Sequence, residues 1–219
     1  MNQNEPICVA DKNAAIIDDL CAKGWSIQND YLSRPAAETL KNRLTGLDAA
    51  SALSTAGIGR KDEHQIAPDI RKDRTYWLER ENSEDLMYLS LMNDLKTGLN
   101  RNLFLGLFEY EAHYAVYPPG GFYKKHFDAV KGGKNRIIST VCYLNDENWQ
   151  DEDGGHLKLY DRTNPDDLVC TALPRARSLA VFLSEDIPHE VATAHRERRS
   201  IAGWFRCNAS SADRADPLR

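Results

Sequence analysis

Apolar residues in the first half of the chain recur at the three- and four-residue spacing of amphipathic helices. Three such stretches are bounded by residues that favour helix ends: a glycine stops the first, and serines can cap the other two. The run 25–27 after the first stretch is a short strand candidate, and residues 74–78 have strand character again. The predicted helices are 11–23 before Gly24, 34–47 after Ser33 and 84–103 after Ser83.

From Phe108 onward the pattern changes to short extended runs separated by turns. Many short strands at such spacing indicate a sandwich or a barrel. With the preceding helices they predict a mainly β protein with flanking helices (α+β class). We expect a single domain over 1–219, in which 1–107 supports a 108–207 β core and 208–219 is a flexible tail. The expected strands of this half are 109–117, 136–144, 156–160, 168–173, 178–183, 190–193 and 199–205.

Residues 51–74 lack a sustained period and mix Gly57, Gly59 and Pro68 with many charges. A loop of this length in a compact domain is usually functional or mobile. Two interpretations stay open: a plain surface loop, or a lid that hinges at the glycines and closes over a substrate.

Composition narrows the possible classes without naming a function. In 219 residues, hydrophobic content of 42% and charged content of 28% are ordinary for a soluble globular protein. The five cysteines form no CxxC pair, which indicates reduced thiols. A net charge of −5 and a pI near 5.7 do not favour a general nucleic-acid binder. No apolar run approaches the ~20 residues that span a bilayer, and residues 1–6 lack the layout of a secretory signal, so we expect no membrane partner and a cytoplasmic location.

The candidate metal ligands are His126 and Asp128 in the segment His126-Phe127-Asp128, together with His189 far downstream. Two histidines and one carboxylate can occupy one face of a metal and leave the opposite face open, which suits iron(II). On a strand, residues two apart point to the same side, so His126 and Asp128 can act together. The pair alone is a weak signal, because six histidines and 33 acidic residues produce roughly one His-x-acid match by chance. His195-Arg196-Glu197 is a second match, but it lies in a charged run that predicts a solvated turn.

Several motifs of the second half occur in a characteristic order. They are Tyr117-Pro118-Pro119-Gly120, Tyr123 before His126-x-Asp128, Tyr143-Leu144-Asn145, Gly154-Gly155-His156-Leu157, Pro188-His189-Glu190-Val191 and the stretch from Arg198 to Trp204. In this order the chain resembles the iron(II)/2-oxoglutarate-dependent dioxygenases and, within them, the prolyl 4-hydroxylases of the oxygen-sensing type and its bacterial relatives. The segment 70–79 looks like the mobile strand-loop element that precedes the core in those enzymes. The resemblance covers roughly half of the chain, and the ordered set is more specific than any one motif.

The resemblance implies a fold and a metal site. The family fold is a double-stranded β-helix, a distorted jelly roll behind N-terminal helices, which agrees with the order of elements above. The resemblance assigns His126, Asp128 and His189 as iron ligands and catalytic residues. The distance in sequence between the two histidines suits a distal ligand that returns on a strand across the barrel.

A site for the co-substrate 2-oxoglutarate is also implied. Family members hold its free carboxylate with an arginine about nine residues past the distal histidine, which is Arg198 here. The neighbouring Arg199 leaves an ambiguity, and alternation along the strand favours Arg198, on the same face as Trp204. A guanidinium suits this task because it meets a carboxylate with two parallel charge-assisted bonds. The resemblance further assigns co-substrate binding to Tyr143, Leu157 and Tyr117, and substrate binding to Tyr123, Trp204, Arg71 and Asp73.

We therefore expect a dioxygenase that hydroxylates a prolyl residue at C4 in a protein, with iron(II), 2-oxoglutarate and dioxygen, releasing succinate and CO2. Ascorbate should support the activity, and the bacterial relatives suggest elongation factor Tu as the substrate. The alternatives are hydroxylation of another protein residue or of a free amino acid, and a non-catalytic binding or sensor module. Oxidative demethylation of nucleic acid is disfavoured because enzymes of that type resemble a pattern with a second arginine where this chain has Trp204, so no nucleic-acid partner is expected.

Overall fold

The structure is a computed structural model that describes residues 8–57, 67, 69–129 and 136–208. Within them are three α-helices, one short 3-10 helix (Asp151–Asp153) and eleven strands, and most of the strands follow the helices, as predicted. The elements are α1 (Val9–Lys23), β1 (Trp25–Gln28), α2 (Arg34–Ala49), β2 (Ser54–Thr55), β3 (Arg74–Trp77), α3 (Ser83–Leu103), β4 (Leu107–Tyr117), β5 (Tyr123–His126), β6 (Arg136–Tyr143), β7 (Leu157–Tyr160), β8 (Leu168–Ala172), β9 (Leu179–Leu183), β10 (His189–Val191) and β11 (Arg198–Cys207).

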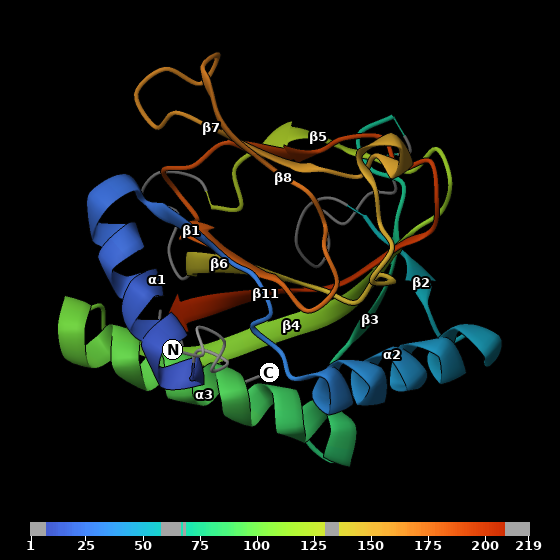
Figure 1. The fold of residues 1–219 in the computed structure, drawn as a ribbon, viewed down its shortest axis with the longest axis horizontal. Coiled ribbons are helices and arrows are strands. Elements are labelled where there is room, and N and C mark those ends of the chain that lie inside the picture. Colours follow the sequence, from blue (N-terminus) through green and yellow to red (C-terminus); the bar gives the residue numbers. More distant parts are fainter. Residues whose placement is uncertain (1–7, 58–66, 68, 130–135, 209–219) are drawn as a thin grey trace, which may run out of the picture.

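Two antiparallel sheets form the β core. The larger sheet has the order β1-β9-β6-β11-β4-β3-β2, and the smaller has the order β5-β10-β7-β8. Figure 1 shows the three helices along one side of the larger sheet and the smaller sheet on its other side. Neighbouring strands are mostly distant in sequence, as in a jelly roll, and the predicted double-stranded β-helix is confirmed.

Strand alternation divides the larger sheet into two faces. On β11, Ile201 and Phe205 belong to the cluster that packs against the helices, together with Met92 of α3. Arg198 and Ser200, which alternate with Ile201 in direction, are buried as well and point to the other face, toward the smaller sheet. The interior between the sheets is therefore lined by alternate residues of the central strands.

The three predicted helices are present, although α1 begins at Val9 instead of residue 11, α2 ends at Ala49 instead of residue 47, and one cap differs. Ser33 caps α2 as expected, and its side chain accepts a hydrogen bond from the amide of Ala36. The prediction of Ser83 as the cap of α3 is wrong. Asn82 caps this helix, because its extended backbone lets its side-chain oxygen accept from the two amides of Glu84 and Asp85.

Part of the expected loop over 51–74 is ordered against the larger sheet. Ser54 and Thr55 of β2 pair with Thr75 and Arg74 of β3. The strands β2 and β5 were not predicted, because their residues, Ser54-Thr55 and Tyr123-Lys124-Lys125-His126, show no apolar alternation. The lid interpretation rests on residues that include 58–66 and 68, which lie outside the described residues, as does the tail over 209–219.

The packing around Gly203 on β11 leaves no room for a Cβ atom. A Cβ there would overlap the phenol oxygen of Tyr110 and lie 2.8 Å from the Cβ of Ala112. We expect Gly203→Ala to lower the free energy of unfolding by about 1–3 kcal/mol, measured by urea denaturation, because an overpacked core must shift its neighbours. The control is Gly46→Ala, where a Cβ on α2 meets nothing within 4 Å, and a gain of about 0.5–1 kcal/mol is expected. Equal effects of the two substitutions would contradict the packing argument.

Candidate functional site

Three of the predicted residues converge at one point between the sheets. His126 at the end of β5 lies directly opposite His189 on β10. The Nε2 atom of His126 is 3.6 Å from Oδ1 of Asp128, and the Nε2 atom of His189 is 3.5 Å from Oδ2 of the same carboxylate. One ligand atom from each residue lies within 4.8 Å of the others, and this is the metal-type group found among the described residues.

The hydrogen bonds of both imidazoles leave Nε2 available. Nδ1 of His126 is 2.7 Å from the carbonyl oxygen of Lys124, and Nδ1 of His189 is 3.2 Å from that of Ile187. A carbonyl oxygen only accepts, so each Nδ1 carries the proton and donates it. The lone pairs on the two Nε2 atoms therefore face the carboxylate, as metal ligation requires.

The charge state of the cluster also suits a metal. Burial lowers the pKa of His189 to about 4, although the Asp128 carboxylate works in the opposite direction. Burial also opposes ionisation of Asp128, but the surrounding imidazoles and Arg136 outweigh it and hold its pKa below the ordinary value. At neutral pH His189 is thus neutral and Asp128 ionised, so neither must lose a proton to bind a dication.

Asp128 is positioned differently from the prediction. His126 and Asp128 were expected to share a face because they lie two apart on one strand, but β5 ends at His126 and Asp128 lies in the bend that follows. The Ser139 hydroxyl donates to Oδ2 of Asp128 at 2.7 Å, and the Ser184 hydroxyl lies 2.8 Å from that of Ser139. No motif marks the two serines, so sequence reasoning missed them.

A second group of predicted residues lies together in the interior, around Arg198. Arg198 is 1% exposed, and it donates to the carbonyl of Gly155 and to the Ser200 hydroxyl. Its guanidinium carbon lies 5.0 Å from the ring centre of Tyr117 and 5.1 Å from that of Tyr143. Leu157 is buried in the apolar cluster that contains Tyr143. All four co-substrate residues are therefore buried in the interior.

Two donors in this group of residues lack a partner. The buried Nη2 of Arg198 and the buried hydroxyl of Tyr143 make no hydrogen bond within the described part of the chain. Burial raises the pKa of Tyr143 to about 12, against the effect of the Arg198 charge, so its hydroxyl keeps its proton. Buried donors of this kind normally find an acceptor, and a carboxylate would satisfy both at once. The residues present thus fit the carboxylate of an oxoacid.

The choice between the two adjacent arginines is decided by the strand. Arg199 points away from the interior, is partly exposed and pairs with Glu197. Arg198 lies opposite Tyr117 on β4 and faces the interior. The predicted preference for Arg198 therefore agrees with the geometry. The competing histidine of the sequence, His195, lies exposed in a bend as predicted.

Of the predicted substrate residues, Tyr123, Arg71 and Asp73 form one group of contacts next to His126, and Trp204 lies on β11. Tyr123 stacks on the ring of His126, and Trp204 lies opposite Ser139, whose hydroxyl holds the carboxylate. Arg71 and Asp73 form a two-bond ion pair with each other. Their role in substrate binding stays a prediction.

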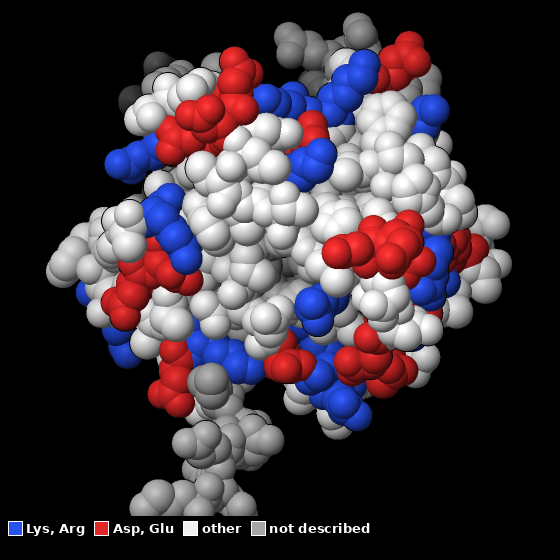
Figure 2. Space-filling view, turned by 45° about the horizontal axis from the view of Figure 1, so that its top comes forward, with Lys and Arg blue, Asp and Glu red and all other residues white. Residues whose placement is uncertain are grey.

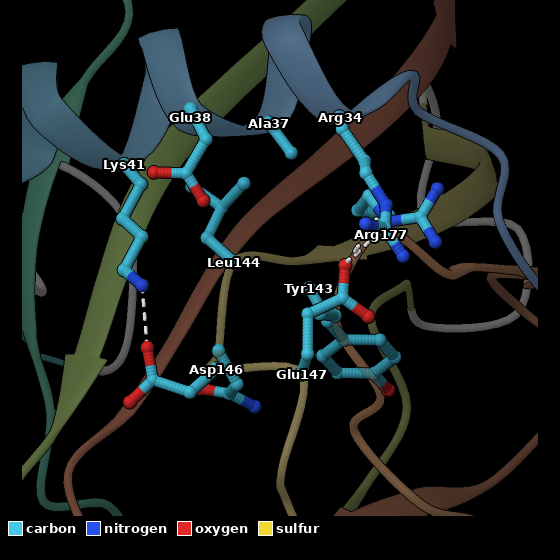
Figure 3. Close-up of a pocket in the computed structure, with 11 residues that line it drawn as sticks. Arg34, Ala37, Glu38, Lys41, Tyr143, Leu144, Asp146, Glu147 and Arg177 are labelled. Atoms are coloured by element: carbon cyan, nitrogen blue, oxygen red, sulfur yellow. Dashed lines mark hydrogen bonds and ion pairs between the residues drawn. The ribbon is translucent and has the colours of Figure 1, made fainter.

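A surface cavity of about 290 Å³ lies apart from the cluster, between α2 and the segment after β6. Figure 3 shows two ion pairs at this cavity, Lys41 with Asp146 and Arg177 with Glu147. Of the predicted site residues only Tyr143 borders it. This cavity is therefore not the predicted site.

Charges of both signs are interspersed on the face drawn in Figure 2, around a stretch of uncharged residues. That face lacks the one-signed field typical of nucleic-acid binding. Among the described helices, none has both the length and the apolar character that crossing a bilayer requires.

Comparisons with known proteins agree with this geometry. Residues 112–206 match the model of the 2OG-Fe(II) oxygenase superfamily. A hypoxia-inducible factor prolyl hydroxylase of Caenorhabditis elegans is 31% identical over 208 residues, which cover 87% of this chain and 27% of that protein, so the chain spans about a quarter of this curated relative's length.

Two solved structures are similar over most of the chain. A prolyl-4-hydroxylase from Pseudomonas putida is 39% identical, with a TM-score of 0.80, and the match covers 89% of this chain and 98% of that one. A Trichoplax adhaerens prolyl hydroxylase, solved with a peptide fragment of the hypoxia inducible factor oxygen degradation domain, is 25% identical, with a TM-score of 0.80 and 90% of both chains covered. The chain belongs to the 2OG-Fe(II) oxygenase superfamily and, within it, to the prolyl 4-hydroxylases.

Proposed function

We propose that this protein hydroxylates a prolyl residue at C4 in a protein substrate, with iron(II), 2-oxoglutarate and dioxygen. One observation carries the proposal. The barrel interior that gathers His126, Asp128 and His189 also buries two donors without partners, on Arg198 and Tyr143. The same interior thus fits both the metal and the oxoacid on which the reaction depends.

When bound, iron(II) and 2-oxoglutarate supply the oxidation of a C–H bond by dioxygen, in which one oxygen atom enters the substrate and the other enters succinate as CO2 leaves. His126, Asp128 and His189 would hold the metal from one side and leave the other open. Arg198 and Tyr143 would donate hydrogen bonds to the distal carboxylate of the oxoacid and so fix its orientation. The buried side chain of Leu157 would help to exclude water from the bound oxoacid.

The substrate side of the proposal rests on aromatic residues and on the relatives. Tyr123, which stacks on His126, and the buried Trp204 are the aromatic residues that the resemblance assigns to substrate binding. The Trichoplax relative was solved with a protein-derived peptide, which favours a protein over a free amino acid. Elongation factor Tu is the first substrate to test, on the sequence resemblance alone. We further propose a cytoplasmic location and support of activity by ascorbate.

The test is turnover with iron(II), 2-oxoglutarate and ascorbate on purified elongation factor Tu and on proline-containing peptides. Succinate release should accompany the gain of one oxygen atom on a proline, and hydrolysis should yield 4-hydroxyproline. The control is the same peptide with alanine in place of the target proline, which should remain unmodified. Oxygen gained on another residue, or on free proline only, would overturn the prolyl assignment in favour of one of the alternative hydroxylases. Absence of any turnover and of 2-oxoglutarate binding would favour a non-catalytic module.

A further inference from the structure

We infer that Arg71 is a positioning residue for the metal ligand His126 and that it acts through the ring of Tyr123. The inference rests on the proposed function, because it concerns the proposed metal ligands. It assigns Arg71 a task inside the protein, in addition to its predicted contact with substrate.

The first observation is an irregularity of β5. Residues three apart on a regular strand point to opposite faces, so Tyr123 and His126 should not meet. Tyr123 pairs with Val191 and His126 pairs with His189, so β5 advances by one residue more than β10 between these pairs. Such a bulge re-aims a side chain, and here it brings both rings to one side. The ring centres of Tyr123 and His126 lie 3.6 Å apart at an angle of 18°.

The second observation is the position of the Arg71 guanidinium. Its central carbon lies 4.5 Å from the ring centre of Tyr123. The His126 imidazole lies against one face of the Tyr123 ring, so the Arg71 guanidinium lies against the opposite face. The tyrosine is thus held between a guanidinium and a metal ligand, in a contact that is attractive on the cationic side.

The guanidinium itself is fixed in place. Its Nε and Nη2 donate to the two oxygens of Asp73 at 2.7 and 2.6 Å, and Asp73 is 2% exposed. A fork with two bonds fixes the plane of the group as well as its position. Because both donors are bound to Asp73, they are not available to a substrate in this structure, and Arg71 serves to hold residues of the protein itself in place.

The backbone around Arg71 is also attached to β5. Arg71 lies opposite Tyr123 in an isolated antiparallel bridge. The amide of Lys72 donates to the carbonyl of Phe122 at 3.0 Å, and the amide of Lys124 donates to that of Ile70 at 2.9 Å. Arg71 therefore holds its register against the strand that carries His126.

The experiment measures binding of Mn(II) alone, without 2-oxoglutarate, by the electron paramagnetic resonance signal of the free ion. Arg71→Gln should weaken binding about three- to tenfold, because the ring that supports His126 loses its covering cation. A purely electrostatic role predicts the opposite sign, since removing a cation lowers the repulsion of a dication. The matched control is Arg74→Gln, which removes an arginine of the adjoining strand that pairs with Asp48 on α2 and should leave Mn(II) binding unchanged.

A double-mutant cycle separates positioning from a general effect on the fold. In a Tyr123→Leu background, Arg71→Gln should weaken Mn(II) binding no further, because the ring that transmits its effect is gone. An equal loss in both backgrounds, unchanged binding in Arg71→Gln, or an equal loss in Arg74→Gln would each overturn the inference. Failure of the proposed function looks different: the wild-type protein would then bind no Mn(II), or would bind it equally well after His189→Ala.

Discussion

The His189→Ala variant is expected to lose metal binding and to turn over at less than about one-thousandth of the wild-type rate. Loss of a group that merely supports a ligand typically costs ten- to a hundredfold in metal affinity or activity, so loss of a ligand should cost more. His189 is buried, and its Nε2 faces the shared carboxylate at 3.5 Å. Mn(II) titration and succinate release, measured on the same preparation, test the two consequences together.

The control for His189→Ala is His195→Ala. His195 belongs to the competing His-x-acid match but lies exposed in a bend, so its loss should change neither quantity. Thermal unfolding of the metal-free variants shows whether each is folded. A folded His189→Ala protein with wild-type turnover would remove this histidine from the ligand set.

The Arg198→Lys variant is expected to raise the KM for 2-oxoglutarate by about tenfold to a hundredfold, the range expected for the loss of one charge-assisted hydrogen bond. Lysine keeps the charge, but it is a point charge that cannot form two parallel bonds to a carboxylate. It also loses the bonds with which Arg198 holds the Gly155 carbonyl and the Ser200 hydroxyl. Initial rates at varied 2-oxoglutarate, with peptide saturating, measure the change.

The adjacent residue provides a control with the same chemical change. Arg199→Lys alters an arginine that is partly exposed and paired with Glu197, so the KM for 2-oxoglutarate should stay within about twofold of wild type. If Arg199→Lys raised this KM and Arg198→Lys did not, the assignment of the oxoacid arginine would be reversed.

Elements with a long period were predictable from the sequence. The helices α1, α2 and α3 and the long strands β4, β6 and β11 appear where the sequence pattern places them, because each helix buries one face and residues along a strand point alternately to its two faces. For the same reason, alternation along β11 was enough to select Arg198 over Arg199. The N-cap of α3 is Asn82 and not the predicted Ser83, because either residue type can cap a helix and the backbone geometry decides between them.

The site was predictable in its residue types but not in its geometry. The order of motifs identified His126, Asp128 and His189, and the structure brings them together. The reason expected for the shared direction of His126 and Asp128 was wrong, because the strand ends between them and a bend takes over. The support from Ser139 was missed because a serine inside an apolar strand gives no signal of its own.

By itself, then, the sequence determined the candidate ligands, the candidate arginine and the strand face on which that arginine lies, because these depend on the order of motifs along the chain and on the local period of two. Only the tertiary structure decided that Tyr123 stacks on His126, that Arg71 covers the same ring and that Ser139 holds Asp128. These contacts depend on the register between strands and on one extra residue in β5, and a change of register by one residue would turn every side chain to the other face.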